Sequence, residues 1–211
     1  MKKEREIVIK PIETETVTVT IRGTSDLILN KMNDRTVREL TEERKNKSKT
    51  ITEANPWEDI ITSIHWEKPL PKDIVYSEET YRDLLKNNRP CITGFGLKES
   101  WKQAVTRNEI DQYSTKFNNA VHIVGSDNIP VRFTESYIDE KLMSPKKGSP
   151  VLARLNRFTG WEADVKFSYL VGGTYSLEQI LQVIGLAGFG LGIGSGRNSE
   201  YGRYEITGVK A

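Results

Sequence analysis

Glycine dominates one stretch near the end of this chain and limits what the chain can fold into. Between residues 185 and 196, glycine occurs at every second or third position: Gly185, Gly188, Gly190, Gly192, Gly194 and Gly196. Such a backbone reaches positive φ angles readily and approaches neighbouring atoms closely, because no Cβ is in the way. The stretch therefore predicts a glycine loop, over residues 185–206, that lies against another surface.

The segments on either side of this loop fix the order of elements around it. Behind Ser176, a good N-cap residue, apolar residues recur with helical spacing at Leu177, Ile180, Leu181 and Ile184. Residues 201–209 are typical of a strand. The order is thus helix, glycine loop, strand, whereas nucleotide-binding loops place a strand before the glycines and a helix after them. The sequence excludes both the Rossmann and the P-loop interpretations.

Composition narrows the class of protein. With 211 residues, 36% hydrophobic residues and a net charge of +2, the chain fits a single domain with large polar insertions and not a polycationic tail protein. The single Cys91 cannot form an internal disulfide, which favours a reducing compartment. No apolar run approaches the ~20 residues of a membrane span, and the first residues lack the apolar core of a signal peptide. We expect a cytoplasmic protein that does not enter the membrane.

Alternation and helical periodicity predict the remaining core elements. Residues 16–22 alternate apolar and polar side chains, as in a half-buried strand. The others are a helix over 97–105 after a turn at Gly94 and Gly96, two short strands within 120–133 around a Gly-Ser-Asp-Asn turn, and strands over 151–157 and 163–169. Once the insertions are set aside, the order is strand, helix, strand, strand, helix, strand. This order predicts a ferredoxin-like βαββαβ fold, shared by RRM domains. This is an α+β fold with an antiparallel sheet and helices on one face.

Two regions fall outside this core pattern. Residues 24–90 predict a large insertion or small helical lobe, with short helices near 56–64 and 81–86. Within it, residues 31–49 are rich in lysine and arginine with glutamates interleaved, which fits a solvated helix and a nucleic-acid contact equally well. Residues 134–150 predict an exposed, basic loop.

Two motifs together resemble one protein family. The segment from Cys91 to Lys102, Cys-Ile-Thr-Gly-Phe-Gly-Leu-Lys-Glu-Ser-Trp-Lys, resembles the start of the first helix in the RAMP superfamily (repeat-associated mysterious proteins). The glycine loop with its Glu-Tyr-Gly-Arg-Tyr ending resembles the glycine-rich loop that enters the last strand of that superfamily. Thr93, Phe95 and Glu99 stand where CRISPR backbone subunits usually have Pro, Ser and Gly.

The resemblance implies a protein that holds single-stranded RNA or DNA through backbone contacts. It further implies several copies along one strand or a place in a multisubunit ribonucleoprotein, as in CRISPR effector backbone subunits. A thumb-like loop kinks the strand in those subunits, and residues 126–150 are the candidate for it here. Similar sequences also resemble phage-encoded proteins, so an antiviral defence setting and a phage setting both remain open.

Backbone binding of a strand requires cations along a groove and flat side chains for stacking. We expect phosphate or backbone contacts from Gly94, Gly96, Lys98, Lys102, Arg132, Arg154, Arg157, Gly192, Gly194, Gly196, Arg197 and Arg203. Phe95, Tyr201 and Tyr204 supply aromatic rings nearby. Free amides at the start of the helix after Gly94 would favour phosphate. A tight strand-to-helix turn would equally require Gly94 and Gly96.

The sequence offers few candidates for catalysis. Some RAMP relatives are endoribonucleases that use a histidine, and the two histidines here are His65 and His122. Some backbone subunits cleave RNA with a loop aspartate, and the candidates are Asp26, Asp34 and Asp127, none of which any spacing favours. Cys91 fits a buried small residue, and no spacing predicts a metal site or a cofactor. The open functions are strand binding, RNA cleavage, and structural assembly without nucleic acid.

Overall fold

The central element is β1 (Thr14–Gly23), whose alternating pattern buries Val17, Val19 and Ile21 on one side. The structure is a computed structural model that describes residues 12–46, 55–143 and 151–210. In it β1 pairs antiparallel with β9 (Glu162–Leu170) and with β10 (Tyr204–Lys210). The main sheet has the order β10-β1-β9-β6-β4-β3, and β5 also pairs with β9.

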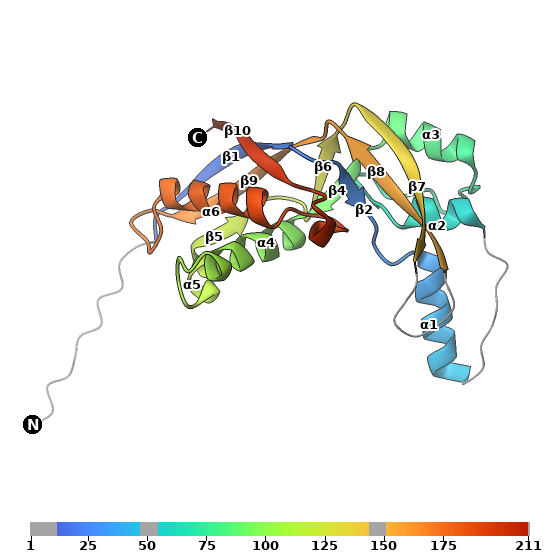
Figure 1. The fold of residues 1–211 in the computed structure, drawn as a ribbon, viewed down its shortest axis with the longest axis horizontal. Coiled ribbons are helices and arrows are strands. Elements are labelled where there is room, and N and C mark those ends of the chain that lie inside the picture. The colour runs from blue at the N-terminus through green and yellow to red at the C-terminus, as the bar shows by residue number, and fades with distance from the viewer. Residues whose placement is uncertain (1–11, 47–54, 144–150, 211) are drawn as a thin grey trace, which may run out of the picture.

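The core follows the predicted chain order. After β1 come α4 (Gly94–Arg107), β5 (Val121–Ile123) with β6 (Asn128–Arg132), β9, α6 (Leu177–Gly190) and β10. Their spatial order, with β1 and β9 in the middle, is that of the ferredoxin-like fold. The helices α4, α6 and α5 (Ser114–Ala120) lie on one side of this sheet (Figure 1). The predicted α+β fold class is confirmed.

The two short strands within residues 120–133 are present, but they do not pair with each other. Val121 lies opposite Tyr169 and Val131 lies opposite Ala163, so β5 and β6 both pair with β9. They form one interrupted strand, and the Gly-Ser-Asp-Asn segment between them is an excursion and not a hairpin turn. Its Asp127 carbonyl accepts a hydrogen bond from the Gly94 amide at 2.7 Å.

A second, three-stranded sheet takes only one of its strands, β2 (Leu27–Leu29), from the insertion at residues 24–90. Its order is β2, β8 (Val151–Thr159), β7 (Glu135–Met143). Residues 24–90 also form α1 (Asp34–Asn46), α2 (Pro56–Thr62), β3 (His65–Trp66) and α3 (Glu78–Asn87), which β4 (Pro90–Thr93) connects to α4. The second sheet and α1 to α3 lie at one end of the molecule, and the helices of the core lie at the other (Figure 1).

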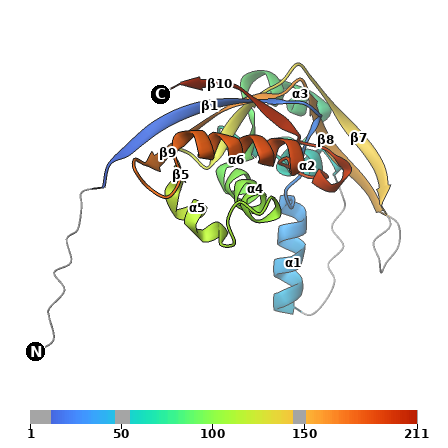
Figure 2. The same cartoon turned by 60° about the vertical axis from the view of Figure 1, so that its left-hand side comes forward.

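The region expected to be a basic loop is instead half of a hairpin. β7 pairs along its whole length with β8, from Glu135 opposite Thr159 to Met143 opposite Val151. The expectation of a loop over 134–150 is therefore wrong up to Met143, and residues 144–150 lie outside the described residues. Of the candidate thumb at 126–150, residues 128–132 belong to β6 in the main sheet. Figure 2 shows the β7–β8 hairpin running away from the core helices.

The glycine stretch divides into a helical part and a loop. α6 continues to Gly190, six residues beyond the last apolar residue of its predicted pattern at Ile184. A Cβ on Gly188 would lie 2.2 Å from the Tyr204 carbonyl oxygen, so this glycine lets α6 pack tightly on β10. The true loop covers residues 191–203, includes the short 3-10 helix η1 (Arg197–Ser199), and enters β10 at Tyr204.

Candidate nucleic-acid interface

The glycine loop packs against its own chain. The Ser195 amide donates to the Ile28 carbonyl of β2 at 2.8 Å, and the Ile193 amide donates to the Gly202 carbonyl at 3.0 Å. Gly194 has φ +75°, and a Cβ there would lie 2.5 Å from the Ile28 carbonyl oxygen. The surface that the glycines were expected to meet is therefore β2, together with the end of the loop itself. Gly192 and Gly196 also have positive φ, and they face Gly202 and Tyr201.

The start of α4 has no free amides in its first turn. The Gly94 amide donates to the Asp127 carbonyl, and the Phe95 amide donates to the Asp127 carboxylate at 2.8 Å. The Gly96 amide donates to the Thr93 hydroxyl at 3.0 Å. The expected phosphate site at these amides is thus already filled by protein groups, which supports the alternative of a tight strand-to-helix turn. Asp127 caps α4, so its carboxylate is engaged.

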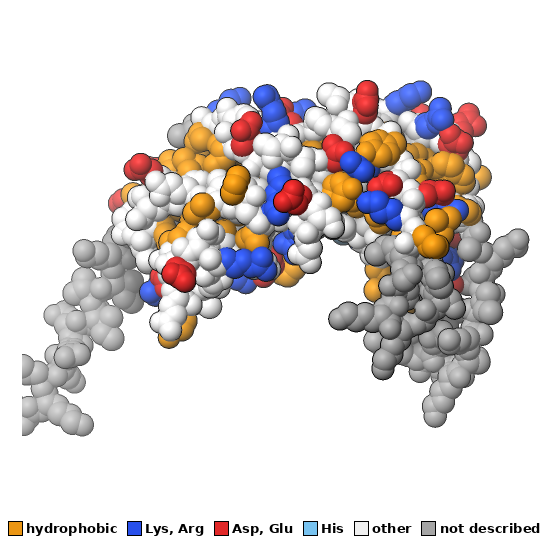
Figure 3. Space-filling model, in the orientation of Figure 1, with side chains coloured by type: hydrophobic (Ala, Val, Ile, Leu, Met, Phe, Trp, Pro, Cys, Tyr) orange, Lys and Arg blue, Asp and Glu red, His pale blue; other side chains and the backbone are white. Residues whose placement is uncertain are grey.

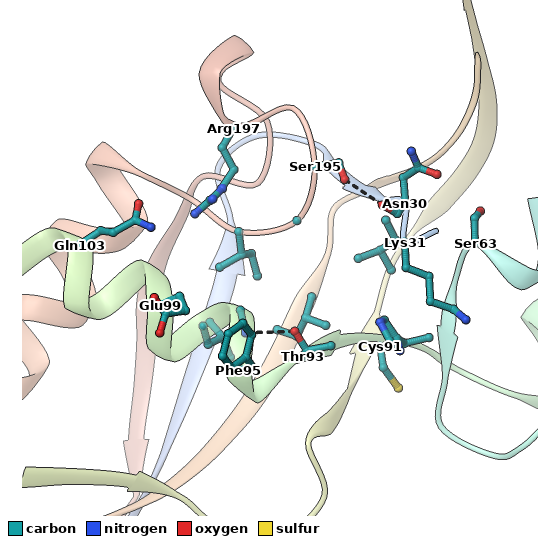
Figure 4. A pocket seen from close by; sticks show the side chains of 17 residues that line it. Asn30, Lys31, Ser63, Cys91, Thr93, Phe95, Glu99, Gln103, Ser195 and Arg197 are labelled. Atoms are coloured by element: carbon teal, nitrogen blue, oxygen red, sulfur yellow. Dashed lines mark hydrogen bonds between the residues drawn. The ribbon is translucent and has the colours of Figure 1, made fainter. Parts of the chain in front are cut away.

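A cavity of about 460 Å³ lies where the two RAMP-like motifs meet. It is lined by residues of β2, of the start of α4, and of the glycine loop. In Figure 4, Arg197 points from the loop toward α4, on the same side as Gln103, while Asn30 and Lys31 approach from the end of β2. Phe95 stands at the first turn of α4 and is 70% exposed.

A second cleft of about 270 Å³ continues from the first, because Gln103 and Arg197 line both. Its other walls include Arg107 of α4, and Asn198 and Arg203 of the loop. Together the two form the α4–loop groove, defined by Phe95, Glu99, Gln103 and Arg107 on one side and by Ile193, Gly194, Ser195, Arg197, Asn198 and Arg203 on the other. The α4 residues are spaced by four and so share one helical face, about 18 Å long at 1.5 Å per residue.

Three arginines at one end of this groove lack a counter-charge. Among the described residues, no carboxylate forms an ion pair with Arg107, Arg197 or Arg203. Within the same part of the chain, Arg203 Nη1 is buried without a hydrogen-bond partner, and Nη2 reaches only the Arg197 carbonyl, at 3.5 Å. Uncompensated positive charge in a cleft attracts an anion.

The other predicted cations lie elsewhere. Arg132 forms ion pairs with Glu162 and Asp164 on the strands of the main sheet, at 3.1 and 2.7 Å. Arg154 pairs with Glu140 across the β7–β8 hairpin at 2.7 Å. On α4, Lys102 pairs with Glu99 at 2.6 Å.

Lys98 and the basic segment complete this survey of cations. Lys98 is half-buried and lines neither part of the groove. Burial, followed by the charge of Lys102, lowers the pKa of Lys98. In the basic segment 31–49, Arg35 and Arg38 pair with the α2 carboxylates Asp59 and Glu58. The described part of that segment therefore fits a solvated helix held by ion pairs.

Arg157 is held inside a cluster of its own chain. Its Nε and Nη2 contact Asp26 Oδ2 at 2.8 and 2.7 Å, and its Nη1 lies 3.4 Å from Asp139 Oδ2. The guanidinium also lies 5.1 Å from the ring centre of Tyr137 and 4.9 Å from that of Tyr201. This Arg157 cluster joins the hairpin to the glycine loop, and it engages both Asp26 and Tyr201.

The residues considered for catalysis differ in where they lie and in how buried they are. His65 lines the larger cavity, and burial, followed by the charge of Lys31, lowers its pKa from the ordinary 6.5. His122 is exposed on β5, and Asp34 lies at the start of α1, 3.8 Å from Lys31. Cys91 is buried, and burial raises the pKa of its thiol to about 12, as expected for an inert small residue. Within the described ranges, no group of three or more His, Cys, Asp or Glu is placed to hold a metal.

The outer face of the main sheet does not offer the stacking platform of RNA-binding RRM domains. On the two central strands, its side chains include Thr16, Thr18, Asp164 and Lys166. The aromatic residues of β9, Phe167 and Tyr169, are buried on the opposite face. Stacking on an RRM sheet requires exposed aromatic rings, and the outer face of these two strands presents none.

Sequence reasoning missed Gln103 and Arg107 as groove residues. The signal was present as the spacing of four from Phe95 through Glu99 and Gln103 to Arg107, which places all four side chains on one face of α4. That face was not recognised because its residues are polar, whereas the helix was identified from its apolar face.

By sequence, the chain matches no family model and no curated relative. Among solved structures, it is similar to a chain of the type III-B Cmr-beta complex bound to cognate target RNA, with a TM-score of 0.49 and 12% identity. That match covers 93% of this chain and 60% of the other, so this chain spans less than two thirds of that protein. It is also similar to Cmr6 from Pyrococcus furiosus, with a TM-score of 0.39, 11% identity, and coverage of 92% and 99%. Both TM-scores lie below 0.5, so the functional argument rests on the residues of this chain.

No helix among the described residues is long and apolar enough to cross a membrane.

Proposed function

We propose that this protein is a RAMP-type subunit that binds single-stranded RNA, or DNA, in the α4–loop groove. The observation that carries this proposal is the cleft with Arg107, Arg197 and Arg203, three arginines without an ion-pair partner among the described residues. The two RAMP-like motifs form the walls of the same groove. Phosphates occupy the arginine end, and an unpaired base stacks on the exposed Phe95 at the other end.

The chemistry of the groove favours backbone recognition over sequence reading. Guanidinium groups bind phosphate oxygens in a fixed, forked geometry and ignore base identity. An aromatic ring accepts any base, because every base has a π-face. The protein therefore binds strands of differing sequence with similar affinity. Several copies follow one strand, and the protein works in the cytoplasm as part of a ribonucleoprotein.

Binding of labelled single-stranded RNA and DNA at several salt concentrations tests the proposal. The variants are Arg107→Ala, Arg197→Ala and Arg203→Gln, with Phe95→Ala for stacking. Each lost phosphate contact reduces the slope of log affinity against log salt by about 0.7. Phe95→Ala weakens binding at every salt concentration, by about 1–3 kcal/mol for a stacked base, and leaves the slope unchanged.

Two cations of the same type outside the groove provide matched controls. Arg132→Ala and Arg154→Ala each remove an arginine that already pairs with carboxylates, so both affinity and slope stay close to wild type. Equal losses from all five arginine variants would show that only overall charge matters. No binding of either strand at low salt would overturn the proposal and leave structural assembly as the function.

A second candidate function, RNA cleavage, rests on the position of His65. It lines the same groove in which the strand is proposed to lie, and its lowered pKa keeps the imidazole neutral at pH 7. A neutral imidazole accepts the proton of a ribose 2′-hydroxyl, whose oxygen attacks the adjacent phosphorus as the P–O5′ bond breaks. The imidazolium then returns the proton to the leaving 5′-oxygen. RNA has this hydroxyl and DNA lacks it. The expected products are RNA fragments from bound RNA, with single-stranded DNA left intact.

Gel analysis of bound RNA checks this candidate. The rate of cleavage rises with pH through the lowered pKa of His65 and levels off above that pKa. His65→Ala abolishes cleavage and retains binding, whereas His122→Ala, on the exposed strand β5, changes neither. RNA that stays intact with the wild-type protein, or cleavage that survives in His65→Ala, would exclude this role.

A further inference from the structure

A second groove lies at the end of the molecule away from the core helices. It has a volume of about 680 Å³ and runs between α3 and β7, so we call it the α3–β7 groove. One face of α3 contributes Tyr81, Arg82 and Leu85, and β7 contributes Ser136, Tyr137 and Ile138. Figure 3 shows hydrophobic side chains gathered at this end of the molecule. Nothing in the α4–loop groove uses these residues.

The groove follows the edge of a strand. Ser136, Tyr137 and Ile138 are consecutive, and successive side chains of a strand point to opposite faces of the sheet. A groove that touches all three therefore runs along the strand edge and not over one face. β7 is the last strand of its sheet, and no described strand pairs with its outer edge. Its outward amides and carbonyls are thus available to an added strand.

One segment of this chain has the composition of such a strand. Residues 7–9, Ile-Val-Ile, are three β-branched residues between Glu6 and Lys10, and Pro11 follows. β-branched residues favour strands, and a proline ends pairing because it has no amide hydrogen. These residues precede the first described residue, Ile12.

The charges favour this occupant over nucleic acid. α3 carries three carboxylates beside the groove, Glu78, Glu79 and Asp83, and two cations, Arg82 and Lys86, so its net charge of −1 disfavours phosphate. The same carboxylates suit the lysines and arginine that precede the apolar triplet, at Lys2, Lys3 and Arg5.

The segment cannot reach the groove of its own molecule. β1 runs from Thr14 to Gly23, where the chain turns toward the second sheet, and α3 and β7, which line the groove, lie beyond that point (Figure 1). The ten residues of β1 extend about 33 Å, whereas the seven residues 5–11 span about 23–25 Å when fully extended. Residues 5–10 therefore fall short of β7 of the same molecule.

We propose that the α3–β7 groove accepts residues 5–10 of a second copy of this chain as an added strand beside β7. The described chain begins at Ile12, at the end of the molecule away from α3 and β7 (Figure 1), so the contact joins unlike surfaces and copies associate head to tail. This supplies the contact for the multimer in the proposed function. It does not depend on the α4–loop groove, and it operates without nucleic acid.

Sedimentation of the full chain without nucleic acid, over a range of concentrations, tests the proposal. The wild-type chain forms dimers and longer species as concentration rises. The double variant Ile7→Asp and Ile9→Asp stays monomeric, because each buried isoleucine contributes about 1.5–3 kcal/mol and its loss weakens association at least about tenfold. A fluorescent peptide of residues 2–10 binds this monomeric variant, and amide exchange slows along residues 135–143.

Two groove variants and one control locate the contact. Leu85→Glu places a charge in the groove, and Ser136→Arg, a milder change that leaves the core intact, blocks the strand edge. Both weaken peptide binding at least about tenfold. The control is Val75→Asp. The Val75 side chain is 75% exposed and does not line the groove, so this variant binds the peptide as wild type does.

The outcomes separate this proposal from nucleic-acid binding. The proposal of an added strand is overturned if the peptide does not bind, or if it binds the two groove variants as tightly as it binds the protein without them. It is also overturned if RNA, and not the peptide, slows amide exchange at residues 135–143. If the monomeric double variant binds RNA, and the arginine substitutions in the α4–loop groove weaken that binding as they do in wild type, the proposed function stands regardless of the peptide result. Self-association that survives Ile7→Asp and Ile9→Asp also overturns the proposal.

Discussion

At the scale of single residues, the surroundings of each arginine decide what it can do. Arg157 lies between two tyrosine rings and contacts two aspartates, so its charge is already compensated. Arg203 carries the same guanidinium, yet one of its nitrogens is buried without a partner in the described structure. Both were equal candidates in the sequence, because a sequence gives the number of charges and not their neighbours. Of these two arginines, Arg203 is the one whose charge is left uncompensated in the described structure.

Arg157→Lys tests whether this cluster is structural. A lysine keeps the charge but loses the fork that contacts Asp26 and the flat group that lies between the tyrosines. We expect the free energy of unfolding to fall by about 1–3 kcal/mol, measured by urea denaturation, because Asp26 and Asp139 lose hydrogen bonds. Arg154→Lys, on the same strand with a single exposed partner, changes it by less than about 0.5 kcal/mol. A loss of the salt dependence of RNA binding in Arg157→Lys would contradict a purely structural role.

At the scale of elements, α6 shows two glycines of one helix with different roles. Gly188 faces β10, and a Cβ there would lie 2.2 Å from a Tyr204 backbone oxygen. Gly185, less than one turn earlier, has open space around its Cβ position. The glycine-rich appearance of residues 185–190 therefore has one clear packing cause, at Gly188. Nothing in the structure explains Gly185.

Alanine substitution at both positions separates these roles. Gly188→Ala forces α6 away from β10, and we expect a loss of about 1–3 kcal/mol in the free energy of unfolding. Gly185→Ala relieves the entropic cost of a helical glycine, and we expect a gain of about 0.5–1 kcal/mol. Urea denaturation of the two variants beside wild type measures both. Equal effects of the same sign would show that the close approach of α6 to β10 is not what requires Gly188.

At the scale of the whole molecule, the glycine loop connects the two sheets. It begins after α6, forms a bridge with β2 through Ser195 and Ile28, and ends where β10 enters the main sheet. This position brings Arg197 and Arg203 over α4 and creates the groove. The α3–β7 groove lies at the end of the molecule away from the core helices, so the surface proposed for strand binding and the surface proposed for self-association do not overlap.

The core fold was predictable because local patterns encode it. The alternation of β1 and β9 and the apolar faces of α4 and α6 each specify one buried face, and their order leaves the ferredoxin-like arrangement. The β7 strand was missed because its residues, Glu135 to Met143, are mostly polar and gain their structure from pairing with β8. The end of α6 was missed because glycine disfavours helices, and tertiary packing of Gly188 against Tyr204 outweighs that preference.

The sequence by itself determined the fold class, the helix–loop–strand order around the glycines, and the two RAMP-like motifs, because these depend on residues that are near one another in the chain. Only the tertiary structure decided which cations stay unpaired, since Glu162, Asp164, Glu140 and Asp26 approach their arginines across strands. It also decided that Asp127 accepts the hydrogen bonds of the first two amides of α4, those of Gly94 and Phe95. Ion pairs and caps of this kind form between residues distant in sequence, and such contacts exist only after the chain has folded.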